Sequence, residues 1–370
     1  MEATPFPTEP FGDDLGPAKV VYIYDPEAGL RAIVAIDNTA CGPAIGGVRM
    51  AADVGAQEVT RLARAMTLKN AAAGLPHGGG KSGIVADPKT ADKPRLMRAF
   101  GRAIRNLVEY IPGPDMGTDE ACLGYLFDET GRAIGIPRVL GGIPLDEIGA
   151  TGYGLAECAE VAASYCDLSI DGARVAIEGF GNVGRHTARF LEEKGARLVA
   201  ASDLGGAIYN PQGLPVNELA AIKREAGTVA AFRPGQRLSG SQIFTVACDI
   251  LVPAARPDSI QARNAAVIQA KLVLEGANIP ATTDAETVLH QRGILVVPDF
   301  IANAGGVICG AVEYRGGTQA IAFQQIAEKI RANTREVLDR SRREAIEPRR
   351  AALALALAHV RSAQTYRKRR

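Results

Sequence analysis

Cysteine and histidine, the residue types that build disulfides and many metal sites, are scarce and scattered in this chain. The 370 residues include six cysteines and four histidines, with no Cys-x-x-Cys pair. Zinc sites and disulfide frameworks need such residues at short, regular spacings, so we expect neither a bound metal nor a disulfide scaffold. This cysteine usage, together with an N-terminus that lacks a signal-peptide pattern, indicates a cytoplasmic protein.

Long apolar runs and an excess of one charge are also missing. No stretch reaches the roughly 18 consecutive apolar residues of a membrane span, so we expect no membrane association. Lys and Arg together number 42 and Asp and Glu number 41, so the charge gives no reason to expect nucleic-acid binding. Apolar residues make up 47% of the chain. This composition and length predict an ordinary globular protein with two domains.

Glycine and proline accumulate around residues 139–150, and we place a domain boundary there. Residues 1–140 carry strand-like runs and amphipathic helices, which predict a first α/β domain. Residues 145–320 begin with a helix, after which strands and helices alternate. That alternation is typical of a parallel, doubly wound sheet with helices on both faces. The last helices, from about 325 to 370, lie far from any strand, and we expect them to pack back over the first domain.

The sequence patterns predict specific helices and strands in each domain. In the first domain they are strands at 20–24, 32–36 and 83–86 and helices at 58–73 and 95–110, with Lys81 in a glycine loop and Asp115 in a Pro/Gly-rich loop. In the second they are a helix at 151–165 and strands at 174–178, 198–202, 250–253, 272–274 and 294–297.

A glycine motif in the second domain predicts a dinucleotide site. Gly179-Phe-Gly181-Asn182-Val183-Gly184 follows an apolar strand and opens a helix, and Asp203 ends the next strand. The glycines allow a close approach of backbone to pyrophosphate, and the helix N-terminus supplies free N–H groups. A carboxylate at Asp203 suits ribose hydroxyls and repels a 2′-phosphate, which favours NAD over NADP. The alternative is a plain glycine turn beside a surface aspartate.

A lysine lies on the apolar stripe of the helix at 58–73. Val59, Leu62, Met66 and Lys69 recur at steps of three and four and therefore share one face. A buried lysine needs an anion, and a substrate carboxylate would supply one. The alternative is a lysine at the edge of the stripe whose charged end reaches solvent.

A second lysine, Lys81, stands in His77-Gly-Gly-Gly-Lys81-Ser-Gly, where small neighbours admit a ligand. Gly80-Lys81-Ser82 also matches the end of a P-loop, but Leu75 stands where that motif needs glycine, so we reject an NTPase. We interpret His77 as structural. Taken alone, Asp115 has the ordinary alternative of a turn aspartate.

Together these segments resemble the glutamate/leucine/phenylalanine/valine dehydrogenase family over about residues 38–310. The most specific match runs from Met66 through Lys69 to Lys81 and is similar to the family's two-lysine signature. Gly42-Pro-Ala-Ile45-Gly46-Gly47-Val-Arg49 resembles its substrate-pocket strand. Further matches are Asp115-Met-Gly-Thr, Ala150-Thr151-Gly-Tyr-Gly, Glu275-Gly-Ala-Asn278 and Ala302-Asn303-Ala-Gly-Gly.

The resemblance implies a role for each matching residue. Lys69, with the backbone of Gly46 and Gly47, would bind the substrate α-carboxylate, and Lys81 and Asp115 would be the catalytic pair. The resemblance further implies that Thr151, Asn278 and Asn303 contact the nicotinamide end or the substrate. It also implies a substrate-binding and oligomerisation domain, a Rossmann-type domain, an active-site cleft between them, and a homo-oligomer.

The expected activity is reversible NAD-dependent oxidative deamination of a 2-amino acid to its 2-oxo acid and ammonia. Lys81 as a neutral amine would activate water, and Asp115 would exchange protons with the substrate nitrogen. Glutamate-type members of the family place a lysine at the position of Ile45. An isoleucine there would leave a distal carboxylate without a partner, so we expect an apolar substrate.

Two alternatives to a dehydrogenase of apolar amino acids remain open. Glu275-Gly-Ala-Asn-Ile-Pro is more glutamate-type, so the chain could be a glutamate dehydrogenase in which Arg315, from the atypical stretch 307–316, replaces the missing lysine. A non-catalytic dinucleotide-binding sensor on the same fold is the other alternative.

Overall fold

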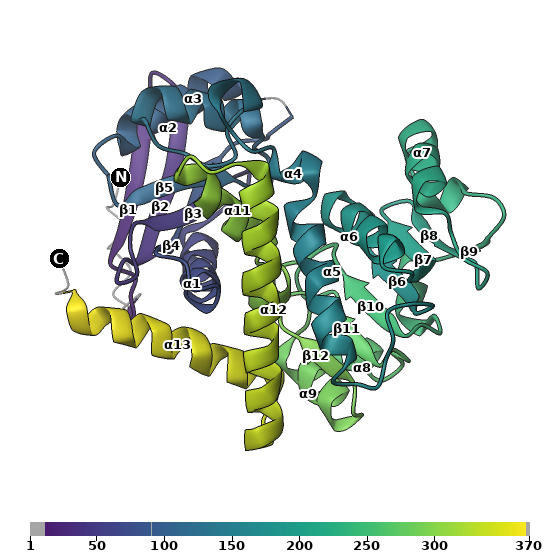
Figure 1. Cartoon of the computed structure of the whole chain (residues 1–370). Coiled ribbons are helices and arrows are strands. Elements are labelled where there is room, and N and C mark those ends of the chain that lie inside the picture. The colour runs from purple at the N-terminus through teal and green to yellow at the C-terminus, as the bar shows by residue number, and fades with distance from the viewer. Residues whose placement is uncertain (1–11, 90, 368–370) are drawn as a thin grey trace. The chain divides into compact units, whose positions relative to one another are not determined.

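The computed structural model describes residues 12–89 and 91–367, and these divide into two compact units (Figure 1). The first unit comprises Met1–Pro144, Glu313–Gly316 and Leu357–Arg370, and the second comprises Leu145–Val312 and Gly317–Ala356. Among the described residues, no helix has the length and apolar character that a bilayer crossing requires.

The first unit is built on a mixed sheet. Its described strands run in the order β1-β2-β4-β3-β5, with β4 antiparallel to β2 and parallel to β3. The elements are β1 (Lys19–Asp25), β2 (Leu30–Asn38), β3 (Ala44–Ala51), α1 (Ala56–Ala72), β4 (Gly78–Val85), α2 (Lys93–Ile104), β5 (Tyr110–Pro114), α3 (Glu120–Thr130) and a 3-10 turn at Arg138–Leu140.

Helices cover both faces of this sheet. Helix α1 packs on one face, where Val59 and Ala63 join Ile33 and Ala35 of β2 in an apolar cluster. Helices α2 and α3 cover the opposite face, and their side chains join a larger core with residues of β2 and β3. The alternation of side chains along each strand supplies both apolar faces.

Two predicted elements of this unit differ from the structure. The predicted glycine loop around Lys81 is strand β4, which hydrogen bonds to neighbours on both sides. The predicted helix 95–110 ends earlier, and its last residues turn into strand β5. Strand β5 contains Pro112 and Pro114 and is tolerated because it lies at the sheet edge, where missing N–H donors matter least.

The second unit is built on a seven-stranded sheet, ordered β12-β11-β10-β6-β7-β8-β9 among the described residues. Its elements, of which α11 and α13 end in the first unit, are α4 (Leu145–Ile148), α5 (Ala150–Ala163), β6 (Arg174–Glu178), α6 (Asn182–Glu193), β7 (Arg197–Asp203), β8 (Gly206–Tyr209), α7 (Val216–Ala226), β9 (Gln236–Leu238), β10 (Ile250–Pro253), α8 (Ala262–Ala265), β11 (Leu272–Leu274), α9 (Thr283–Gln291), β12 (Leu295–Val297), α10 (Asp299–Ala302), α11 (Gly305–Tyr314), α12 (Gln319–Glu344), α13 (Pro348–Tyr366) and 3-10 turns at Val229–Ala231 and Gly240–Thr245.

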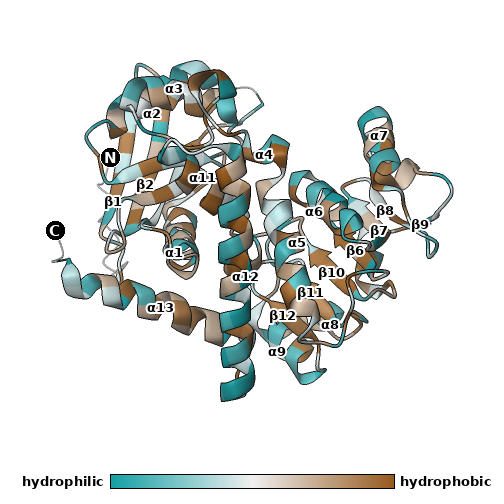
Figure 2. Cartoon of the chain, in the orientation of Figure 1, coloured by the Kyte–Doolittle hydropathy of each residue, from teal (hydrophilic) through white to brown (hydrophobic). Residues whose placement is uncertain are grey.

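The five strands predicted for this unit are present and are all parallel: β6, β7, β10, β11 and β12. The sequence pattern missed β8 and β9, which extend the sheet antiparallel beyond β7. Strands β6, β10 and β11 are largely apolar (Figure 2), as expected for strands covered on both faces.

The long helix α12 lies in the second unit, which differs from the expected packing of the C-terminal helices over the first domain. Its apolar stripe, including Ala322, Ile326 and Ile330, is buried, and it packs along α5. The second unit also keeps the beginning of α13, up to Ala356, and the first unit takes the remainder from Leu357. A helical pattern specifies that a face must be buried but not which surface buries it.

Candidate active site

Lys81 and Asp115 form a buried ion pair in the first unit. Lys81 projects from the middle of β4, and Asp115 follows the last residue of β5. The Lys81 ammonium contacts Oδ2 of Asp115, and the two side chains are only 6% and 12% exposed. Strand pairing thus brings together two residues that the sequence separates widely and that we had selected as candidate catalytic groups.

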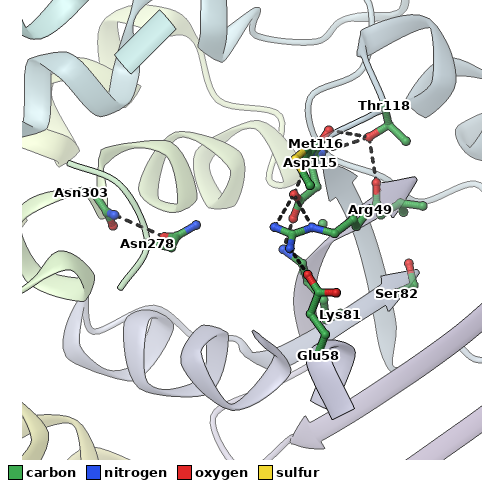
Figure 3. Close-up of polar contacts among 12 residues, drawn as sticks. Arg49, Glu58, Lys81, Ser82, Asp115, Met116, Thr118, Asn278 and Asn303 are labelled. Carbon is green, nitrogen blue, oxygen red and sulfur yellow. Dashed lines mark hydrogen bonds and ion pairs between the residues drawn. The ribbon is translucent and has the colours of Figure 1, made fainter. Parts of the chain in front are cut away.

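Asp115 is also held from its other side (Figure 3). Its backbone N–H donates to Oγ1 of Thr118 over 3.0 Å, and that hydroxyl contacts the carbonyl of Val48 at 2.9 Å. Oδ1 accepts from the Met116 N–H over 2.6 Å and from Nη2 of Arg49 over 3.2 Å. Burial alone would raise the pKa of Asp115, but Lys81 and Arg49 lower it overall. The carboxylate is therefore charged and fixed.

Arg49 and Glu58 are members of this cluster that the sequence analysis did not select. Arg49 lies on β3 and pairs with Glu58 in the first turn of α1 as well as with Asp115. Arg49 was visible only as the end of the substrate-pocket motif. A charged residue within an otherwise apolar segment was the available indication in the sequence.

Lys69 lies on the buried face of α1, as its spacing predicts, and is 9% exposed. Helix α1 reaches β4 closely because Gly79 has no side chain: a Cβ there would overlap the backbone and hydroxyl of Thr67. Asn70 fixes the same contact by donating to the carbonyl of Gly78 over 2.6 Å. The glycine run therefore lets the lysine-bearing helix lie directly on the lysine-bearing strand.

Gly46 and Gly47 lie on β3 beside β4 and β5. The buried Tyr110 hydroxyl donates to the carbonyl of Gly46 over 2.9 Å, and this hydrogen bond helps to fix the position of β3. A Cβ at Gly47 would overlap the side chain of Asp115. Ile45 is 1% exposed and packs with Ile111 and Ile134. Its side chain is thus part of a small apolar cluster.

The environment of His77 agrees with a structural interpretation. Its ring is 3% exposed, lies 3.2 Å from the carbonyl of Pro43, and meets Tyr314 edge-on. Burial lowers the pKa of His77, and the nearby positive charge of Arg315 contributes to this shift. Arg315 itself is exposed. The lysine of the rejected P-loop lies within a strand, so this segment lacks the required loop.

The dinucleotide motif of the second unit has the expected local structure. Gly179 follows β6 with φ +91°, Gly181 is the N-cap of α6, and Asn182 and Val183 form its first turn. A Cβ at Gly184 would overlap the Gly179 carbonyl, so the helix packs tightly on the turn. No side chain caps α6, and the space around Gly181 is open. The helix N-terminus therefore has N–H groups available for a phosphate.

Asp203 lies at the end of β7, as predicted, but its carboxylate is more engaged than expected. Oδ1 accepts from Thr228 over 2.7 Å and from the Gly205 N–H over 2.9 Å, and Oδ2 accepts from the Val229 N–H over 2.8 Å. Lys223 lies 3.3 Å from Oδ2. Burial alone would raise the pKa of Asp203, but these partners lower it overall. The proximity of Lys223 could not be read from its distant position in the sequence.

Asn278 and Asn303 meet in the second unit (Figure 3). Nδ2 of Asn303 donates to the carbonyls of Gly276 and Ala277 and to Oδ1 of Asn278, over 3.1–3.3 Å. Asn303 is 4% exposed, and its Oδ1 is buried without a hydrogen-bond partner among the described residues. Thr151 lies in the first turn of α5, which approaches Gly305 and Gly306 at the start of α11.

The residues of the second unit fit a dinucleotide. The uncapped N-terminus of α6 suits the pyrophosphate, the Asp203 carboxylate suits a ribose, and the orphaned Asn303 oxygen suits an amide N–H. No group of three or more His, Cys, Asp or Glu side chains arranged to hold a metal ion occurs among residues 12–89 and 91–367.

Two family models cover most of the chain. Residues 17–132 match the dimerisation domain of Glu/Leu/Phe/Val dehydrogenases, and residues 141–368 match the Glutamate/Leucine/Phenylalanine/Valine dehydrogenase model. The chain belongs to this family. It is an amino acid dehydrogenase of this family, and its two-domain α/β fold is confirmed.

Several named relatives of this dehydrogenase are glutamate dehydrogenases, and one similar solved structure is the L-tryptophan dehydrogenase of Nostoc punctiforme, with a TM-score of 0.71, 26% identity and coverage of 94% and 96%. The glutamate dehydrogenase of Aeropyrum pernix is 41% identical over 323 residues, which is 81% of this chain and 77% of the relative. The NAD-specific enzyme of Staphylococcus aureus is 37% identical over 351 residues, covering 89% and 84%. The solved hetero-hexameric glutamate dehydrogenase of Thermus thermophilus, in its Leu-bound form, has a TM-score of 0.86 and 29% identity and covers 95% and 90%. The apolar substrate predicted from Ile45 is not confirmed by these relatives.

Proposed function

We propose that this dehydrogenase catalyses the reversible oxidative deamination of L-glutamate to 2-oxoglutarate and ammonia. The observation that carries the reaction type is the buried pair of Lys81 and Asp115, a proton donor and acceptor in direct contact. The names of its relatives favour glutamate over other amino acids. We also propose a homo-oligomer assembled through the first unit, which matches a dimerisation domain, and a cytoplasmic location, which agrees with six free cysteines.

In this proposal each residue of the first unit has a separate task. Lys69, with the backbone of Gly46 and Gly47, binds the α-carboxylate of the substrate. Asp115 accepts a proton from the substrate ammonium, so that the nitrogen lone pair can form the imine double bond as the α-carbon loses a hydride. Lys81 first releases its own proton to solvent and, as a neutral amine, takes a proton from the water that attacks the imine carbon. It then returns that proton to the departing nitrogen as the carbon–nitrogen bond breaks.

The second unit would hold NAD, which supplies the hydride acceptor when bound. The turn Gly179–Gly184 and the α6 N-terminus would bind the pyrophosphate, and Asp203 would bind the adenosine ribose. Asn303, Asn278 and Thr151 would orient the nicotinamide end. The reaction balances as one oxo acid, one ammonium ion, one NADH and one proton for each amino acid, water and NAD consumed.

The distal carboxylate of glutamate needs a cation, and we propose Arg315 for this role. Its guanidinium is exposed and close enough to His77 to lower the pKa of that imidazole. Ile45, by contrast, is buried among Ile111 and Ile134 and offers the substrate almost no surface. In this proposal Ile45 does not face the ligand, which removes the physical reason to expect an apolar substrate.

An apolar amino acid is the second candidate, because the same three isoleucines make the neighbourhood of β3 apolar. Steady-state kinetics with NAD on glutamate, leucine, valine, phenylalanine and tryptophan decide between the two. We expect the highest kcat/KM for glutamate, and a raised KM for glutamate in Arg315→Ala but not in Arg31→Ala, an exposed arginine on β2. A preference for an aliphatic or aromatic substrate would favour the second candidate. If no amino acid is turned over, the non-catalytic dinucleotide-binding sensor becomes the favoured function.

A further inference from the structure

The two oxygens of Asp115 bind different cations. Lys81 occupies Oδ2, whereas Oδ1 accepts from Nη2 and Nε of Arg49 over 3.2 and 3.4 Å and from the Met116 N–H over 2.6 Å. We propose that Arg49 is a positioning residue for Asp115: it anchors Oδ1 and preserves the negative charge, so that Oδ2 is the oxygen that exchanges a proton with the substrate nitrogen. This inference rests on the proposed function.

Arg49 is itself immobilised. Its side chain is 15% exposed, and its Nη1 contacts the carboxylate of Glu58, which belongs to α1. Burial alone would lower the pKa of Arg49, but Asp115 and Glu58 raise it overall. The planar guanidinium is therefore held between two carboxylates (Figure 3). The ammonium of a lysine at this position would reproduce that geometry poorly.

Lys81 has to leave Oδ2 at some point in the proposed reaction, because its amine must reach water or the oxo oxygen. At that point Arg49 is the remaining cation in contact with a carboxylate that is 12% exposed. A buried carboxylate without a counter-charge takes up a proton, and a protonated Asp115 cannot accept one from the substrate ammonium. Arg49 thus keeps Asp115 a base during the step in which Lys81 is occupied elsewhere.

The other groups around Asp115 do not supply this charge. Tyr110, at the start of β5, is fully buried, and burial raises the pKa of its phenol, so it stays neutral. Glu58 reaches the site only through Arg49, and Thr118 and Met116 contribute uncharged hydrogen bonds. Lys81 and Arg49 are the two cations whose charges lower the pKa of Asp115 and that contact its carboxylate.

Three variants test the inference. Arg49→Met keeps the aliphatic stem and removes the charge, and Arg49→Lys restores the charge without the fork. Arg61→Met is the matched control, since Arg61 is an exposed arginine on the neighbouring helix α1. The pH dependence of kcat/KM for the amino acid is measured for each. In parallel, the pKa of Asp115 is read from its side-chain carboxyl ¹³C resonance, assigned by its loss in Asp115→Asn.

In Arg49→Met we expect both the pKa of Asp115 and the acid limb of kcat/KM to move to higher pH, by about one to three units. Arg49→Lys should recover part of both shifts, and Arg61→Met should show neither. The KM for NAD should stay constant, because the change is confined to the first unit.

Two results would overturn the inference. One is an Asp115 pKa that does not move in Arg49→Met, and the other is a pKa that rises while the acid limb stays in place. A wild-type protein that turns over no amino acid would instead refute the proposed function. The ¹³C titration would then still decide whether Arg49 controls the charge of Asp115.

Discussion

The contact between Lys81 and Asp115 can be tested as a pair through a double-mutant cycle. Lys81→Met and Asp115→Asn each remove one charge with little change in volume, and the double variant removes both. The side chains are 6% and 12% exposed, so either single change leaves a charged partner largely shielded from water. Removing one member of a buried pair typically costs about 3–5 kcal/mol.

Arg49 reduces that cost for Lys81→Met, because Asp115 keeps one counter-charge on Oδ1. We therefore expect about 3 kcal/mol or less for this variant, and a coupling energy of about 1–3 kcal/mol across the cycle. Turnover should fall by about 10²–10⁴-fold in each single variant. The double variant should lose little more than the worse single variant, because residues that act as a unit are not additive.

Urea unfolding at one fixed protein concentration measures the stability terms, and NADH absorbance measures turnover. The control is the cycle of Lys19→Met and Glu109→Gln, an ion pair in the same unit with side chains 52% and 25% exposed. Its coupling should stay below about 1 kcal/mol, with turnover unchanged. Additive stability losses at Lys81 and Asp115, or more than about a tenth of wild-type turnover in Lys81→Met, would refute the assigned pair.

Three further predictions concern other parts of the molecule. Asp203→Ser should raise the ratio of kcat/KM for NADP to that for NAD, because it removes a negative charge and frees Lys223 for a 2′-phosphate; a ratio that stays constant or falls would contradict this assignment. Burial raises the pKa of Glu275 well above 4.5, so the folded protein holds a proton that the unfolded chain releases, and stability should fall as pH rises above about 4.5. Glu275→Gln should remove that part of the slope in melting experiments from pH 5 to 8, and an unchanged slope would show that Glu275 is ionised. Gly79→Ala should lower the melting temperature, because the new Cβ displaces α1 at a cost of about 1–3 kcal/mol, and a wild-type melting curve would show that the helix is free to shift.

The sequence predicted those parts of the fold that depend on short-range patterns. Strand β6 and the turn after it follow from an apolar run that ends in glycines, and Lys69 follows from helical spacing. Strand β4 was mistaken for a loop, because glycines have low strand preference. It is a strand because two neighbouring strands pair with it. Its glycines have no side chains, which lets α1 pack directly on its backbone.

The parts that the sequence did not reveal depend on contacts between distant segments. Arg49 reaches Asp115 only because β3 and β5 are neighbours, and Lys223 reaches Asp203 only through the fold of α7. Likewise, Arg349 contacts Glu275, Glu286 and Asp299, which come from three separate segments of the second unit. Contacts between distant segments leave no periodic pattern in the sequence. The charge and spacing of these three basic residues therefore did not reveal their carboxylate partners.

The position of β4 inside its sheet limits how Lys81 can move. Backbone amides on an interior strand that is paired with β2 and covered by a helix are released to solvent mainly when the whole domain unfolds. We therefore expect the amide protons of Gly80 to Gly83 to be among the slowest to exchange with deuterium in this unit. The backbone of Lys81 then stays in place. Any movement of its amine between Asp115 and the substrate comes from rotation about the bonds of its side chain.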